Sequence, residues 1–96
     1  MARKLVERRL IEVSGRLKHL HEELRVVDEQ LEHFADEADD ARIRALVSET
    51  PVAERELREA RKHVDAMQRH RAEVVAEIAK LEQSQDDLLD RLSAES

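Results

Sequence analysis

The chain contains no cysteine, one glycine, one proline and no tryptophan, and its single aromatic residue is Phe34. Without cysteine, a disulfide framework and a thiolate metal site are both excluded. One glycine is too few for a phosphate-cradling loop. A compact globular core normally draws much of its buried area from aromatic side chains, so their scarcity argues against such a core.

Long apolar runs are also missing, because the longest, such as residues 45–47, contain only three residues. No membrane-spanning segment is therefore expected, and no apolar region typical of a signal peptide follows the N-terminus. The net charge of −6 argues against non-specific binding to nucleic acid. We expect a cytoplasmic protein that binds neither membranes nor nucleic acid, and the excess of arginine over lysine suggests a bacterial source.

Charged residues make up 42% of the chain. Between them runs a series of mostly apolar positions, spaced alternately by four and three residues, which we call the seam. The seam's first series is Val6, Leu10, Val13, Leu17, Leu20, Leu24, Val27, Leu31, Phe34, Ala38, Ala41, Ala45 and Ser48. The second series is Ala53, Leu57, Ala60, Val64, Met67, Arg71, Val74, Ile78, Leu81, Gln85, Leu88 and Leu92. Of these 25 positions, 22 are apolar, which is the pattern of coiled-coil helices and argues against disorder.

The one strong break in this pattern is Pro51, which restricts Thr50 to an extended conformation. Thr50 is a favoured N-cap residue, and Pro51 then occupies the first helical position. The sequence therefore predicts an all-α fold in a single domain, residues 1–96. A helix over about 2–48 and a helix over about 51–93 form a long antiparallel two-helix coiled-coil hairpin with its turn at 49–52. Gly15 lies on an outer face and is not expected to end the first helix.

The hairpin pairing is predicted by matching the two seams so that the numbers of opposed residues sum to 101 or 102. This register places Leu20 against Leu81, Leu24 against Ile78 and Phe34 near Met67. Charge favours the same orientation, because the acids within 28–40 would face the bases within 62–73. The basic residues within 3–18 would face acids near the C-terminus, and His63 would pair with Glu37.

Catalytic chemistry is not indicated by any motif. None of the five histidines follows a glutamate by three residues, and His63 and His70 are too far apart to hold one metal ion. We expect no catalytic residue, no metal site and no cofactor. Arg71 and Gln85 interrupt the seam, either because they extend their polar groups to solvent or because they specify register or oligomeric state.

Two surfaces are candidates for binding a partner. The acidic cluster is Asp36, Glu37, Asp39 and Asp40, and it is either a solvated face or a docking surface for a basic partner. At the turn, Ile43, Leu46, Val47 and Val52 lie off the seam together with Glu49. A smaller apolar stripe on the second helix includes Val75 and Leu89.

The function that these features predict is a non-enzymatic coiled-coil module, an adaptor or regulator, that binds another protein or a second copy of itself. A homodimer is expected, because a single seam is marginal for stability. In outline the hairpin resembles the N-terminal hairpin of Gre-type factors, which implies the alternative of a transcription regulator binding RNA polymerase, although no Gre sequence motif is present. It also resembles the secreted Trp-x-Gly hairpin proteins in length and shape, but that motif is missing.

Overall fold

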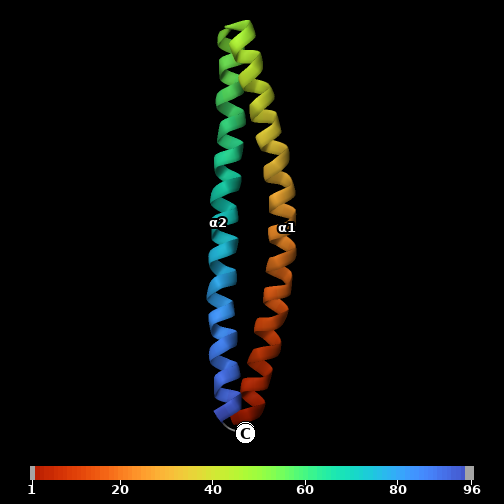
Figure 1. The fold of residues 1–96 in the computed structure, drawn as a ribbon, viewed down its shortest axis with the longest axis vertical. Coiled ribbons are helices and arrows are strands. Elements are labelled where there is room, and N and C mark those ends of the chain that lie inside the picture. The colour runs from red at the N-terminus through yellow and green to blue at the C-terminus, as the bar shows by residue number, and fades with distance from the viewer. Residues whose placement is uncertain (1, 95–96) are drawn as a thin grey trace. The chain divides into compact units, whose positions relative to one another are not determined.

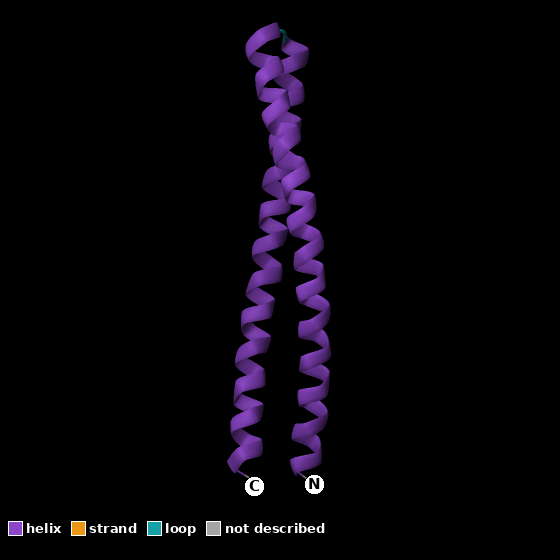
Figure 2. Cartoon of the chain, turned by 45° about the vertical axis from the view of Figure 1, so that its right-hand side comes forward, coloured by secondary structure: helices purple, strands orange, loops and turns teal. Residues whose placement is uncertain are grey.

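The computed structural model describes residues 2–94, and they form two α-helices joined by a short turn (Figures 1 and 2). Helix α1 spans Ala2–Ser48 and helix α2 spans Pro51–Ala94, so only Glu49 and Thr50 lie between them. No strand occurs in the described part of the chain. The predicted all-α hairpin is confirmed, with the end of α2 one residue beyond the predicted boundary.

The turn ends one helix and starts the next through backbone and side-chain hydrogen bonds. The Glu49 amide donates to the Ala45 carbonyl at 3.1 Å, and Glu49 then adopts a positive φ of 51°. A left-handed residue after the last helical turn is a common way to end a helix, although glycine usually holds that place. Thr50 is the N-cap of α2, because its Oγ1 accepts a hydrogen bond from the Ala53 amide at 3.1 Å.

The predicted seam is the buried face of both helices. Every seam residue except Ser48, which stands at the end of α1, is buried or partly buried. The ten buried hydrophobic residues all belong to the seam. The alternating spacing of three and four therefore identified the inward face of each helix correctly.

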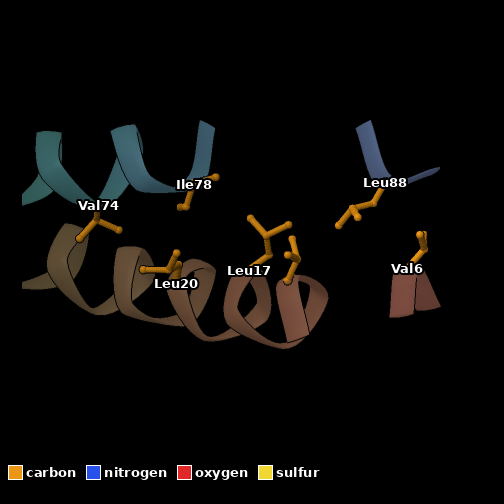
Figure 3. Packing of buried hydrophobic residues seen from close by; sticks show 7 residues of the cluster. Val6, Leu17, Leu20, Val74, Ile78 and Leu88 are labelled. Atoms are coloured by element: carbon orange, nitrogen blue, oxygen red, sulfur yellow. The ribbon is translucent and has the colours of Figure 1, made fainter. Parts of the chain in front are cut away.

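Contacts divide the hairpin into two units, of which the first combines residues 2–24 of α1 with residues 73–94 of α2. Its core is a cluster of branched aliphatic side chains that meet between the helices (Figure 3). Leu20 and Val6 are each only 1% exposed and are the largest fully buried side chains. Leu10, Leu24, Leu81 and Leu92 pack against this cluster from its margins.

The second unit, residues 25–72, includes the turn and has a thinner core. Its buried hydrophobic residues are Val27, Ala41 and Ala53. Because alanine contributes little apolar area, burial stabilises this unit less per residue than it stabilises the first. The Phe34 ring packs edge-on against His63, with ring centroids 5.4 Å apart, and Glu37 pairs with His33 on its own helix instead of the predicted His63.

The predicted register of the two helices is wrong by about one seam layer. Across the hairpin the structure joins Ser14 to Gln85 and Asp28 to Arg71, and these residue numbers sum to less than 101. In Figure 3, Ile78 points toward Leu20, the residue that the prediction placed opposite Leu81. Because the seam repeats, sliding one helix by one layer still matches apolar residues with apolar residues, and the short turn selects the observed register.

The charge pairing across the hairpin was also only partly predicted. Asp28 and Arg71 form an ion pair between the acids of 28–40 and the bases of 62–73, while Lys62 instead approaches Glu59 on its own helix at 3.5 Å. In the first unit, Arg16 forms an ion pair with Glu77 across the hairpin, and Asp87 accepts a hydrogen bond from Gln83 on its own helix. The predicted partner Glu95 lies outside the described residues. Several of the charged pairs therefore stabilise individual helices rather than the orientation of the hairpin.

Candidate functional site

The acidic cluster lies on the outer side of α1 in the second unit, and all four of its residues are exposed. Glu37 pairs with His33 on the same helix, with Oε1 and Nε2 3.1 Å apart. Asp36, Asp39 and Asp40 form no ion pair with any other described residue. The cluster is therefore not neutralised by α2, and three of its carboxylates remain available to a cation from outside.

The candidate apolar residues around the turn are strongly exposed. Val47 is 80% exposed, Leu46 66%, Val52 59% and Ile43 52%. On the flank of α2, Val75 and Leu89 are less exposed, at 39% and 47%. The end of the hairpin near the turn therefore combines the thinner core with aliphatic side chains that are more exposed than those on the flank of α2.

A groove that we call the acidic groove runs between α1 and α2 along one side of the second unit. It has a volume of about 580 Å³ and is lined by Glu37, Asp40, Ala41, Arg44, Val52, Arg55, Glu56, Glu59, Ala60 and His63. Four carboxylates and two arginines line it, so negative charge dominates. Arg44 reaches across to Glu56 at 3.8 Å, which neutralises part of that charge.

A second groove, which we call the arginine groove, lies beside the turn and was not predicted from the sequence. It has a volume of about 480 Å³ and is lined by Arg42, Ala45, Leu46, Glu54, Leu57, Arg58 and Arg61. Three arginines face one glutamate there, so its charge is positive. The spacing of Arg58 and Arg61 by three residues places them on one helix face, a signal that the negative net charge of the chain concealed.

The predicted site residues thus do not form one surface, because some line the acidic groove, one lines the arginine groove and the others lie outside both. Glu37, Asp40 and Val52 line the acidic groove, whereas Leu46 lines the arginine groove. Asp36, Asp39, Ile43, Val47 and Glu49 are exposed but line neither groove. The grouping made from the sequence did not distinguish the two sides of the hairpin near the turn.

The polar seam residues reach solvent instead of remaining in the core. Arg71 donates from Nε to Asp28 Oδ1 at 2.6 Å, and this hydrogen bond together with the carboxylate's charge raises the pKa of the guanidinium. Gln85 donates from Nε2 to Ser14 Oγ at 3.1 Å. Of the two explanations for Arg71 and Gln85, the observed contacts match extension of the polar groups away from the seam.

Sequence reasoning also missed the apolar residues Leu5 and Ile11 on the outside of the first unit, which are 57% and 74% exposed. Leu5 lines a shallow groove of about 360 Å³ with Val6, Arg9, Ser84, Asp87, Leu88 and Arg91. The sequence signal that could have identified them is that both are apolar residues off the seam in an otherwise charged segment.

No group of three or more His, Asp or Glu side chains is arranged to hold a metal ion within residues 2–94. Within the same residues, neither α1 nor α2 contains a window apolar enough to cross a bilayer. No family model matches the chain, and comparisons with curated proteins and with solved structures find no match.

Proposed function

We propose that the chain is a non-enzymatic coiled-coil interaction module that binds a protein partner through the turn end of its second unit. The observation that supports this proposal most directly is the set of unpaired carboxylates Asp36, Asp39 and Asp40 beside strongly exposed aliphatic residues. Single exposed aliphatic residues are common on protein surfaces, but several of them close to one turn and to unpaired acids are more typical of an interaction surface.

Apolar burial is concentrated in the first unit. The first unit holds the cluster of buried leucine, valine and isoleucine residues, so most apolar burial lies away from the proposed surface. Electrostatic attraction by exposed acids mainly speeds encounter with a basic partner, while the aliphatic residues supply contact area. The proposal keeps the bacterial, cytoplasmic setting inferred from composition.

The experiment that tests this proposal starts with affinity capture from the native host and identification of the captured protein by mass spectrometry. The affinity of that purified partner is then measured for the wild type and for the variant Asp36→Asn, Glu37→Gln, Asp39→Asn, Asp40→Asn. We expect binding to weaken about tenfold or more at low salt and the difference to shrink at high salt, because added ions screen exposed charges.

A matched control removes the same amount of charge from the first unit, by Glu82→Gln, Asp86→Asn, Asp87→Asn and Asp90→Asn. This control variant is expected to bind like the wild type. If both variants weaken binding equally, only the net charge of the chain matters and the acidic cluster is not a docking surface.

The alternative proposal is a transcription regulator that binds RNA polymerase through the hairpin. It rests on Glu49, an exposed acid held at the turn with a positive φ, where an entering hairpin would present it first. The same capture experiment separates the two proposals, because this one requires RNA polymerase among the captured proteins. It further requires that Glu49→Gln, and not only neutralisation of the acidic cluster, weakens the interaction.

A further inference from the structure

The arginine groove holds positive charge that the described chain does not neutralise. Arg42, Arg58 and Arg61 form no hydrogen bond or ion pair with another described residue. Leu57 and Ala45 form an apolar floor between the helices, and Leu46 stands exposed at the edge. Arginine guanidinium groups bind carboxylates through paired hydrogen bonds, so this groove is suited to an acidic occupant.

The acidic groove and the arginine groove lie on opposite sides of the same two helices. Along α1, Asp40 and Arg42 are two residues apart, which separates their side chains by roughly 200° around the helix axis. The same spacing separates Glu56 from Arg58 on α2. Each copy therefore carries a negative groove on one side of the second unit and a positive groove on the other.

We propose that a second copy of the chain occupies the arginine groove and places the carboxylates of its acidic groove against Arg42, Arg58 and Arg61. This inference rests on the proposed interaction function and names a partner for it. The charge of the two grooves is complementary, with two carboxylates in excess in one and two arginines in excess in the other. Each groove also exposes one aliphatic side chain, Leu46 or Val52, so an apolar contact accompanies the ion pairs.

The arrangement has a definite consequence for assembly. Because different surfaces of the two copies meet, the contact is heterologous and leaves one groove of each kind unoccupied in a pair. Association therefore continues beyond two copies as concentration rises, in contrast to the closed homodimer expected from the sequence. Since the contact depends on exposed charges, it weakens as salt is added.

Two double variants isolate the grooves from each other. Arg58→Gln with Arg61→Gln leaves one arginine and one glutamate in the arginine groove, and Glu56→Gln with Glu59→Gln leaves equal numbers of carboxylates and arginines in the acidic groove. Glutamine has a good helix propensity and all four positions are exposed, so folding should be preserved. Far-UV circular dichroism checks that the helix content is unchanged.

The test is sedimentation equilibrium of the whole chain over a range of concentrations at low and high salt. For the wild type we expect a mass that rises above the 11.2 kDa of one chain at low salt and returns toward it at high salt. Each double variant alone is expected to remain at the mass of one chain. An equimolar mixture is expected to reach twice that mass and stop there, because only one native groove of each kind is present.

Matched controls carry the same charge changes in the first unit: Arg8→Gln with Lys18→Gln, and Glu82→Gln with Asp86→Asn. Both should associate like the wild type. The proposal is overturned if the wild type stays at the mass of one chain at low salt, if either double variant alone associates like the wild type, or if the mixture does not associate. Neither double variant substitutes a residue of the acidic cluster, so failure of self-association can be distinguished from failure of the proposed partner binding.

Discussion

Replacing Leu20 by alanine should destabilise the hairpin more than almost any other single truncation, because Leu20 lies at the centre of the first unit's core and is 1% exposed. Truncating a buried leucine removes its transfer free energy and leaves a cavity, at a total cost of about 2–5 kcal/mol. Leu24 and Leu81, which pack against this core, are only partly buried, and a seam one layer thick can admit water or close over the gap. We therefore expect Leu20→Ala to lower the free energy of unfolding by about 2–3 kcal/mol, near the lower end of that range.

The measurement is urea unfolding followed by far-UV circular dichroism, with all variants at one protein concentration and at high salt, where the proposed self-association through Leu46 is suppressed. Leu46→Ala is the matched control, since it makes the same chemical change in the same helix at a position that is 66% exposed. A surface substitution of this kind should change the free energy of unfolding by no more than about 0.5 kcal/mol. If Leu20→Ala and Leu46→Ala cost the same, the seam described by the structure is not the core that holds the helices together.

Two further predictions concern the backbone. Gly15 stands inside α1 with nothing within 4 Å of the position a Cβ would take, so Gly15→Ala should raise the free energy of unfolding by about 0.5–1 kcal/mol in the same assay. A lower stability would mean that the position is not a freely exposed helical site. Glu49 holds a left-handed conformation that glycine adopts without strain, so Glu49→Gly should stabilise by about 0.5 kcal/mol after the greater flexibility of the unfolded chain is subtracted. A clear loss of stability on urea unfolding would contradict this reading of the turn.

The helices and their inward faces were predictable because their signals are local or repeat many times. Thr50 and Pro51 together mark a helix start through side-chain capping and a fixed φ, and the structure places that start as expected. Seam burial depends on the sum of many positions, so interruptions such as Arg71 and Gln85 do not alter it. Both residues keep their seam places by extending their polar ends toward Asp28 and Ser14.

The register was not predictable by the same reasoning, because the seam is nearly periodic. Shifting one helix by a layer exchanges Leu81 for Ile78 opposite Leu20, and both partners are branched aliphatic residues of equal size. Charge did not resolve the choice either, since exposed ion pairs contribute little and basic residues often find an acid three or four positions along their own helix, as Arg3 does with Glu7. The short turn decides the register, because the conformations of Glu49 and Thr50 determine where α2 begins relative to the end of α1.

The distribution of the candidate residues between two grooves was not predictable either, because it also depends on the register of the two helices. A sequence scan groups residues that are neighbours in the chain, and so it placed Asp39 and Asp40 in one acidic surface and Ile43 and Leu46 in a second surface at the turn. On a helix, residues two apart point in nearly opposite directions, which sends Asp40 into one groove and Arg42 into the other. Each groove is completed only by residues of α2, whose angular position depends on the register that the seam leaves open. The charge asymmetry between the two sides therefore emerges from the paired helices, and it is this asymmetry that makes one copy complementary to the next.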